Sequence, residues 1–443
     1  MNRSLAYKLG AMALLMVILV AALARIGGVI GERQAVRDQV VLDIARSSSL
    51  DQLITGPILV VPFRRTLTEW HEDTISRSRS AVTREVKGQL YFLPEVFRFD
   101  GKLHTERRAR GIYEVRLYHA DNQLSGHIEL PAKYGIDDDF AAYHFETPFL
   151  SVGISDIRGI ANDLAVQLNG QSLKFIPGSG VSLLGSGVHV PLAGVDGRET
   201  SHLEFAIALQ LQGTSQFHVT PVGRETVVTL SSDWPHPGFT GDYLPTKRSV
   251  ASTGFNAQWQ TSFFSTNLEE ALRHCSKEDN CSEFHSRHFG VSFVDPVDQY
   301  LKSDRAIKYA LLFIALTFAG FFLFEVLKKL AIHPVQYGLV GAALALFYLL
   351  LLSMSEHIDF AIAYLVAATA CIALIGFYVG HVLESARRGA AFATSLAVLY
   401  GLLFGLITAE DYALLMGAIL LFALLTAVMI LTRRVNWFSL SVK

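Results

Sequence analysis

The pattern of hydrophobic and polar positions divides the chain into two apolar parts separated by a long stretch of mixed composition. Residues 9–31 are nearly free of charge, residues 32–303 mix polar and apolar side chains, and long apolar runs return from residue 304 onward. A helix needs about 20 mainly apolar residues to cross a bilayer. We therefore predict a membrane protein whose middle part, residues 32–303, lies outside the bilayer.

Six segments are long enough to be transmembrane helices, and we predict them at 9–31, 304–327, 334–355, 358–380, 389–409 and 411–432. Ser303 and Asp304 stand where they would cap the second helix and place a negative charge at its positive end. Pro334 stands near the first position of the third helix, where its missing N–H costs nothing. The first segment has an alternative, because residues 22–24 have the A-x-A form of a signal-peptide cleavage site. Since its apolar character continues beyond that site, we favour an uncleaved anchor.

The basic residues predict how these helices are oriented. If six helices alternate, one side carries Arg3, Lys8, Lys328, Lys329, Arg387, Arg388, Arg433 and Arg434. The short loops on the other side carry Glu356, Asp359, Glu410 and Asp411. Because cytoplasmic loops are enriched in Lys and Arg, we expect residues 1–8 and 433–443 in the cytoplasm and residues 32–303 outside it.

The residue pattern of the middle part of the chain predicts one helix followed by many short strands. Helix-spaced apolar residues indicate a helix over 33–55, which Gly56 and Pro57 would end. From about 58 to 294 the pattern is that of strands joined by short turns. In 202–211 every second residue is apolar, which indicates a strand with one buried face. We predict a large antiparallel, sandwich-like β domain, with two β subdomains as the alternative.

Composition and charge narrow the possible functions. The chain is 51% hydrophobic and only 18% charged, against about 25% charged in a typical soluble domain. Acidic residues slightly outnumber basic ones in 33–303, which argues against nucleic-acid binding. No charged residue lies near the middle of a predicted span, which weakens the case for an ion-coupled transporter. Gly376 with Gly380, and Gly401 with Gly405, have the spacing of helix contacts.

Cysteine and histidine residues cluster near the end of the middle part. Cys275 and Cys281 are six residues apart, and two close cysteines outside the cytoplasm suggest a disulfide. His274, His285 and His288 lie beside them, so a zinc site is the alternative. The cysteine spacing departs from the usual zinc-binding pattern, and we favour a disulfide-closed polar loop.

Residues 231–245 form the most unusual stretch of the middle part. Asp233, Trp234, His236 and Asp242 occur there among several prolines, and we predict a rigid loop whose exposed side chains recognise a partner. Two other interpretations remain. In the first, Asp233, His236 and Asp242 form an acid–base group, although no nucleophile motif accompanies them. In the second, the loop is purely structural and its tryptophan lies in the core. We expect no catalytic residue.

Several long phrases resemble a known family, and they are GPILVVP (56–62), YFLPE (91–95), SDIRGI (155–160), SSDWPHPGFTGDYLP (231–245), GFNAQW (254–259), SDRAIKYALLFIALTFAGFFLFE (303–325), HPVQYGLVGAALALFYLLLLSMSEH (333–357) and NWFSL (436–440). They resemble the CreD family of inner membrane proteins over almost the whole chain. The segment with Cys275 and Cys281 is not part of this resemblance.

The resemblance implies a cell envelope integrity protein of Gram-negative bacteria, linked to a sensor-kinase and response-regulator system. It implies no enzyme activity, cofactor or metal. We therefore expect a multi-pass inner membrane protein whose periplasmic domain supports envelope integrity or stress tolerance. Beside the bilayer itself, its partner would be an envelope protein or a lipid. The alternatives are a lipid or small-molecule transporter with a periplasmic gate, and an envelope hydrolase.

Overall fold

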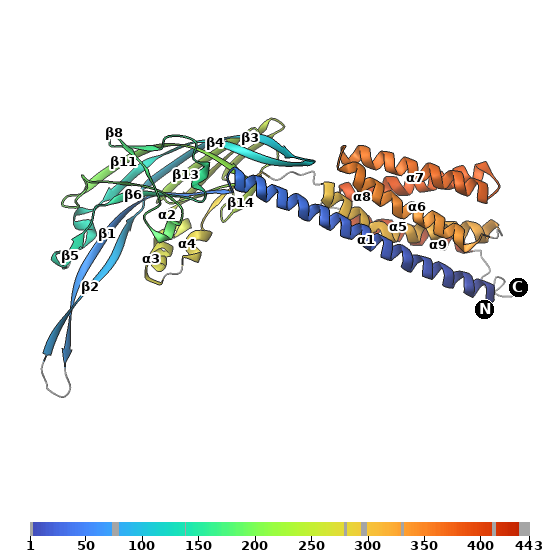
Figure 1. Cartoon of the computed structure of the whole chain (residues 1–443), viewed down its shortest axis with the longest axis horizontal. Helices are drawn as coiled ribbons and strands as arrows, with labels where there is room; N and C mark the ends of the chain where they lie inside the picture. The colour runs from blue at the N-terminus through green and yellow to red at the C-terminus, as the bar shows by residue number, and fades with distance from the viewer. Residues whose placement is uncertain are drawn as a thin grey trace. The chain divides into compact units, whose positions relative to one another are not determined.

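The computed structural model describes residues 3–72, 79–137, 139–278, 281–293, 299–328, 332–409 and 413–433. The chain forms two compact units: residues 1–39 with 297–443, here called the helical unit, and residues 40–296, here called the β domain. Figure 1 shows the helices of the first and the sheets of the second. Lys329, Glu410, Asp411 and Arg434, which entered the predicted orientation, lie outside the described residues.

A single helix, α1 (Arg3–Ser47), covers the first predicted span and the first part of the predicted helix 33–55. The end predicted for that helix is wrong, because β1 (Gln52–Glu72) already contains Gly56 and Pro57. Residues 52–55 pair in parallel with residues 217–220 of β12 (Gln216–Thr220). This pairing joins segments far apart in the chain, so local periodicity does not reveal it.

The described residues of the β domain form two sheets. The nine-stranded sheet has the order β14 (Gly238–Gly241), β17 (Phe289–Ser292), β12, β1, β6 (Phe149–Ile154), β10 (Gly187–Pro191) and β9 (Ile176–Pro177), with β2 (Arg79–Phe92) and β5 (Tyr143–Phe145) also paired to β1. The eight-stranded sheet has the order β15 (Lys247–Ala251), β16 (Gly254–Ser262), β13 (Glu225–Ser232), β3 (Val96–Arg110), β4 (Tyr113–Leu130), β11 (Ser201–Thr214), β7 (Ala165–Leu168) and β8 (Gln171–Lys174).

The two sheets share one core. The rings of Phe99 on β3 and Tyr118 on β4 lie 6.0 and 5.8 Å from the ring of Phe217 on β12, which belongs to the other sheet. The predicted alternation is confirmed in β11, where Leu203, Phe205 and Ile207 are buried and the residues between them are exposed. One compact β domain therefore stands in place of the alternative with two subdomains.

Most strand pairs are antiparallel, as predicted, but β1 with β12 and β3 with β13 are parallel. A tight turn joins only antiparallel neighbours, whereas parallel neighbours need a long connection. Turn signals in the sequence therefore indicate antiparallel pairs and give no information about parallel ones. The two parallel pairs were missed for this reason.

The strands β1 and β2 continue beyond the sheet as a two-stranded arm. Their pairing runs from Leu59 and Phe92 out to Glu72 and Arg79. The third strand β5 pairs with β1 only at residues 63–65. Figure 1 shows the arm projecting from the rest of the β domain.

Short helices complete the β domain. They are η1 (Ala132–Gly135), η2 (Phe140–Ala142), η3 (Ile157–Gly159), η4 (Ser182–Leu184), α2 (Phe263–Thr266), α3 (Leu268–Glu278) and α4 (Ser282–Ser286). Cys275 on α3 and Cys281 before α4 are joined as a disulfide, which connects these two helices.

The helical unit contains α5 (Gln299–Lys328), α6 (Pro334–Ser355), α7 (Phe360–Val382), α8 (Ala386–Thr408) and α9 (Ala413–Thr432), besides most of α1. Among the described residues, five segments are long and apolar enough to cross a membrane: Gly10–Ser47, Gln299–Phe322, Pro334–Ser355, Phe360–Val382 and Ala386–Thr408. The helix α9 lies where the sixth span is predicted.

The helix ends test two predicted caps. The prediction for Ser303 and Asp304 is wrong, because α5 begins at Gln299 and both residues lie inside it. Residues 299–302 also belong to the helix, and Asp304 pairs with Lys308 one turn later, at 2.7 Å. The prediction for Pro334 is confirmed: it opens α6, and His333 is the N-cap residue.

Glycines set one close helix contact. A Cβ on Gly389 of α8 would lie 2.5 Å from the Cα of Gly380 on α7, and one on Gly376 would lie 2.9 Å from the Cβ of Ala393. The predicted contact role of Gly376 and Gly380 is therefore confirmed. That of Gly401 is wrong, since a Cβ there meets nothing within 4 Å. Small-residue spacing alone does not say which helix face has a neighbour.

Two tyrosines hold carboxylates of the helical unit. The hydroxyl of Tyr337 donates to the buried Glu325 at 2.8 Å, and that of Tyr300 donates to Glu356 at 3.1 Å. Arg33 also lies 3.7 Å from Glu356. Hydrogen bonds to such carboxylates offset the cost of removing them from water.

Candidate binding sites of the β domain

The predicted recognition loop is anchored by its tryptophan. Trp234 is 7% exposed and belongs to the main core. The guanidinium carbon of Arg116 lies 3.6 Å from the centre of its ring, and its indole N–H donates to the backbone carbonyl of His236 at 2.8 Å. The expectation of an exposed aromatic at this position is wrong, because the ring is used to hold the loop on the sheet.

Asp233 also holds the loop in place. Its carboxylate accepts hydrogen bonds from the backbone N–H and the hydroxyl of Thr105, both at 3.0 Å. Asp242 is exposed, and its backbone N–H donates to the carbonyl of His288 at 2.9 Å. Within the described part of the chain, no hydrogen bond or ion pair joins the side chains of Asp233, His236 and Asp242. The geometry gives no support to an acid–base group made of these three residues.

The exposed part of the loop borders a shallow pocket of about 420 Å³, lined by Pro235, His236, Pro237, Gly238, Phe239, Arg248 and Val250. The ring of His236 is exposed and lies edge-on to Trp234, with 5.4 Å between the ring centres. Of the four residues predicted for recognition, His236 is the one whose side chain lines this pocket. Arg248 of the edge strand β15 joins it there.

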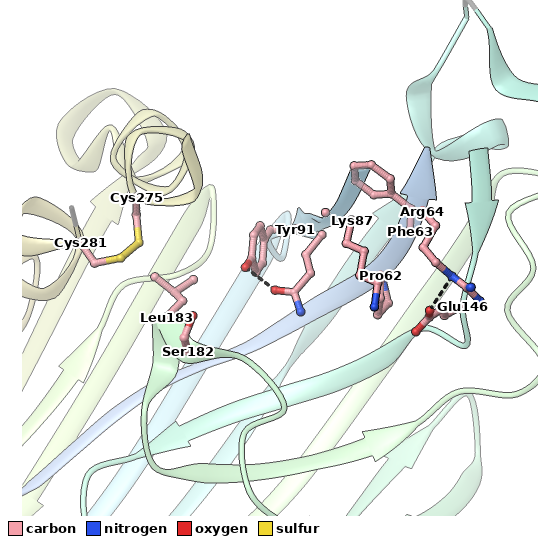
Figure 2. A pocket seen from close by; sticks show the side chains of 12 residues that line it. Pro62, Phe63, Arg64, Lys87, Tyr91, Glu146, Ser182, Leu183, Cys275 and Cys281 are labelled. Carbon is pink, nitrogen blue, oxygen red and sulfur yellow. Dashed lines mark hydrogen bonds and ion pairs between the residues drawn. A yellow bond between two sulfur atoms is a disulfide. The ribbon is translucent and has the colours of Figure 1, made fainter. Parts of the chain in front are cut away.

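A second pocket, of about 470 Å³, lies beside the disulfide. Its lining is Pro62, Phe63, Arg64, Lys87, Gly88, Gln89, Tyr91, Glu146, Ser182, Leu183, Cys275 and Cys281, and Figure 2 shows these side chains. They come from β1, β2, η4 and the helical segment α3–α4, together with Glu146 just after β5. The two cysteines were predicted from their spacing. The other residues were missed, because pairing between distant segments brings them together.

The chemistry of this pocket is mixed. Arg64 lies 3.2 Å from Glu146, and the hydroxyl of Tyr91 donates to Gln89 at 2.7 Å. Burial raises the pKa of Tyr91 further above neutral pH, and its hydroxyl is protonated and able to donate a hydrogen bond. Phe63 and Leu183 supply apolar surface. Such a lining suits a ligand with both an apolar and a charged or polar portion.

The disulfide bears on the predicted zinc alternative. Zinc is bound by cysteine thiolates, and a disulfide leaves neither Cys275 nor Cys281 in that form. His288 instead lies edge-on to His218, with 4.9 Å between the ring centres. Burial, with a smaller effect from His288, lowers the pKa of His218 to about 4, and Thr240 lies 2.9 Å from its Nε2.

The phrase SDIRGI has a structural role at the start of the β domain. Arg158 contacts the carboxylate of Asp156 through Nε at 2.9 Å and Nη2 at 2.6 Å. The same carboxylate accepts from the backbone N–H of Leu50, and Arg158 donates to the carbonyl of Arg46 at the end of α1. The hydrogen bonds that the Asp156 carboxylate accepts, from the Arg158 side chain first and then from backbone N–H groups, lower its pKa to about 2. The pair thus fixes the passage from α1 to β1.

Comparison with known proteins bears on the resemblance noted above. The family model described as inner membrane protein CreD matches residues 4–438. The chain belongs to the CreD family. Inner membrane protein CreD of Escherichia coli (strain K12) is 38% identical over 414 residues, which cover 93% of this chain and 89% of that protein. The family expected from the sequence phrases is therefore confirmed, and with it an inner membrane protein with several candidate spans.

Solved structures add no argument about the fold. Two crystal structures of an M1 zinc metallopeptidase from Deinococcus radiodurans align with 38% of this chain, at 10% and 8% identity and with TM-scores of 0.19. The aligned region makes up 39% and 38% of those two solved chains. Likeness at this level carries nothing over to this protein.

Proposed function

We propose that this CreD-family member maintains envelope integrity by binding, with its β domain in the periplasm. The observation that supports this proposal is the pocket beside the disulfide, which combines Arg64 and Lys87 with apolar surface. The ligand would be an envelope protein segment or a lipid that carries an acidic group beside an apolar one. Binding, rather than catalysis, agrees with the structural use of Asp233 and Trp234.

The topology belongs to the same proposal. Six spans, with α9 as the last, would place Lys328, Arg387 and Arg388 in the cytoplasm and Glu356 and Asp359 in the periplasm. A disulfide between Cys275 and Cys281 is the form expected in that oxidising compartment. The two lines of argument are independent, because one uses charge and the other uses sulfur chemistry.

Thiol labelling in intact cells tests the topology. In a Cys371→Ala background, cysteine is introduced at His357, in the loop before α7, or at Ser385, before α8. An impermeant reagent should label His357→Cys and leave Ser385→Cys unlabelled until the membrane is opened. Labelling of Ser385→Cys in intact cells would contradict the six-span arrangement.

Photocrosslinking tests the pocket. A photoreactive residue at Lys87 or Gln89 should capture one defined envelope component, and the same residue at the exposed Ser172 of β8 should not. Arg64→Glu should reduce both the capture and the tolerance of cells to detergent. Equal capture from Ser172, or normal tolerance with Arg64→Glu and Lys87→Glu combined in a stably folded protein, would contradict the proposed role.

Lipid transport is the second candidate, and one observation favours it. A groove of about 410 Å³ between α6 and α7 is lined by apolar residues, with Ser353 and Cys371 as its polar members. A groove of this kind suits an acyl chain rather than an ion. Lipid exchange between vesicles by the purified full chain, blocked by bulky substitution at Ala367, would support transport, and unchanged exchange would count against it.

A further inference from the structure

Four ionisable side chains meet on the exposed face of the eight-stranded sheet. In the pairing of β4 with β11, Glu129 lies opposite His202 and His127 lies opposite Glu204. Residues opposite one another in an antiparallel pair project to the same face. Leu130 and Leu203, their neighbours along the strands, are buried in the core. The two histidines and two glutamates therefore form a cross-strand square on the outer side.

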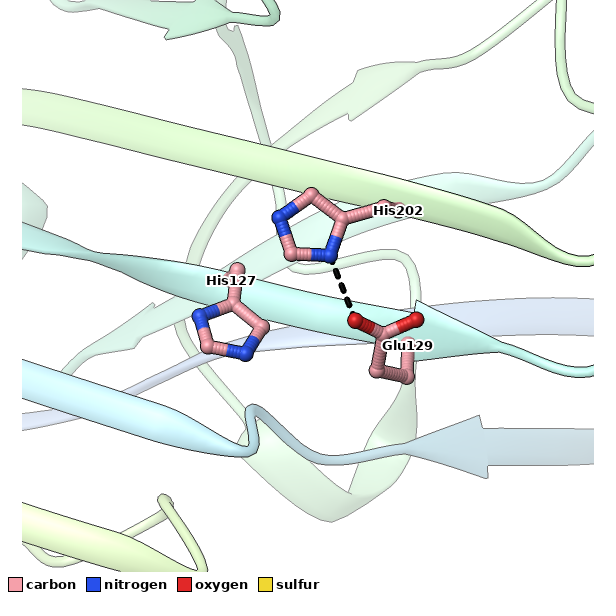
Figure 3. A group of neighbouring side chains, drawn as sticks. All are labelled: His127, Glu129 and His202. Atoms are coloured by element: carbon pink, nitrogen blue, oxygen red, sulfur yellow. Dashed lines mark hydrogen bonds and ion pairs between the residues drawn. The ribbon is translucent and has the colours of Figure 1, made fainter.

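Three of these side chains converge. The ligand atoms offered by His127, Glu129 and His202 all lie within 4.8 Å of one another. Figure 3 shows the three side chains gathered on neighbouring strands. Nδ1 of His202 is hydrogen-bonded to Glu129, and its Nε2 lies 3.6 Å from Glu204. The rings of His127 and His202 are 4.7 Å apart and inclined by 31°. A plain ion pair between histidine and glutamate does not need the second imidazole.

The backbone that carries these residues is held firmly. Both β4 and β11 are interior strands of their sheet, between β3 and β7. The side chain of Asn169 accepts from the N–H of Glu204 at 2.8 Å and donates to the carbonyl of His202 at 3.0 Å. The ligand positions are therefore fixed by strand pairing, and adjustment is left to the side chains.

We infer that His127, Glu129 and His202 form a binding site for a divalent zinc-class ion. Two imidazoles and one carboxylate are a known zinc ligand set, which leaves a fourth position for water or for an added ligand. Zinc bonds of about 2.0–2.2 Å place the ligand atoms of a tetrahedral site roughly 3.4 Å apart. The ligand atoms would have to approach one another by no more than about 1.4 Å to reach this spacing. Glu204 adds a negative charge beside the site, which favours a cation.

Zinc binding by the full chain tests this inference. The protein, purified in detergent without a histidine tag and freed of metal by a chelator, is dialysed against zinc in the presence of excess magnesium and calcium. Bound zinc is measured by mass spectrometry of the element. We expect one zinc ion per chain, and a rise in melting temperature when zinc is added.

Variants locate the ion. His127→Gln and His202→Gln should each weaken zinc binding by at least about tenfold. The matched control is His119→Gln, because Nε2 of His119 lies 3.0 Å from Glu106 on the same sheet, and this carboxylate is also contacted by the cation Arg108. This control should bind zinc like the unaltered protein. Circular dichroism before titration verifies that each variant is folded.

Three results would overturn the inference. They are the absence of stoichiometric zinc binding, binding unaffected by either histidine substitution at the site, and equal weakening by His119→Gln. The second result would place the ion elsewhere on the chain. The third would mean that any exposed histidine–glutamate pair of this protein takes up zinc.

Discussion

The β domain and the helical unit bury aromatic cores of similar kind but present opposite surfaces. In β11 the exposed positions include His202, Glu204 and Gln210 and no large apolar side chain, whereas in α6 they include Leu339 and Leu346. Burial of apolar surface against water stabilises the first arrangement. Between apolar helices in lipid that force is missing, and close packing takes its place. The same chain thus relies on two sources of stability.

Buried polar groups show the same difference. In the β domain, Asp156 is bonded to backbone N–H groups and to Arg158 where α1 joins the sheets. In the helical unit, Glu325 and Glu356 are bonded to the hydroxyls of tyrosines on other helices. The first arrangement fixes the path of the backbone, and the second connects helices. Four measurements would break or sharpen this comparison.

The largest effect is expected at Trp234. Truncation of this buried ring in Trp234→Ala should lower the free energy of unfolding by about 3–5 kcal/mol, measured by denaturant unfolding. His236→Ala should change it by less than about 0.5 kcal/mol, because the exposed ring is lost and the backbone acceptor for the indole remains. Equal losses in the two variants would contradict the division of the loop into an anchor and an exposed part.

The Asp156 junction should follow. Asp156→Ala leaves several donors without an acceptor and should cost about 3 kcal/mol of unfolding free energy. Asp163→Ala is the control, because Asp163 and its partner Lys174 are both well exposed and such pairs contribute about 0–1 kcal/mol. Thermal unfolding of the two variants measures the difference, and similar melting temperatures would show that the junction is not a special site.

Acid should weaken the β domain through His218. Its folded pKa of about 4 lies below the ordinary value of 6.5, so the unfolded chain binds the proton more readily. The stabilising effect is therefore complete above pH 6.5 and is lost as the pH falls toward 4, by about 3 kcal/mol. His218→Gln should show a flatter pH dependence of unfolding free energy over this interval. Parallel curves for the two proteins would contradict this assignment.

The smallest effect is expected between the helices. Gly389→Ala forces a methyl group against the backbone of α7 and should destabilise the helical unit by about 1–2 kcal/mol. Gly401→Ala meets open space and should stabilise its helix by up to about 1 kcal/mol. Unfolding of the full chain in detergent, followed by loss of helix signal, gives the sign of each. Changes of the same sign would remove close packing as the explanation.

Local sequence patterns determined the elements of this protein. Among the described residues, five of the six spans predicted from apolar runs are helices long and apolar enough to cross a membrane. Alternating apolar residues predicted the strand β11, and the sequence phrases predicted the family. These features were accessible because each depends on residues near one another in the chain. The prediction failed where local signals compete, as at residues 52–57, where distant pairing turns a predicted helix end into strand.

Only the tertiary structure decided which distant residues meet. The parallel pairing of β1 with β12, the lining of the pocket beside Cys275 and Cys281, and the cluster of His127, Glu129 and His202 all depend on strand register. A shift of register by one residue would turn a strand's side chains to the opposite face. The sequence therefore determined what each segment is, and the packing of two sheets determined which polar side chains share a site.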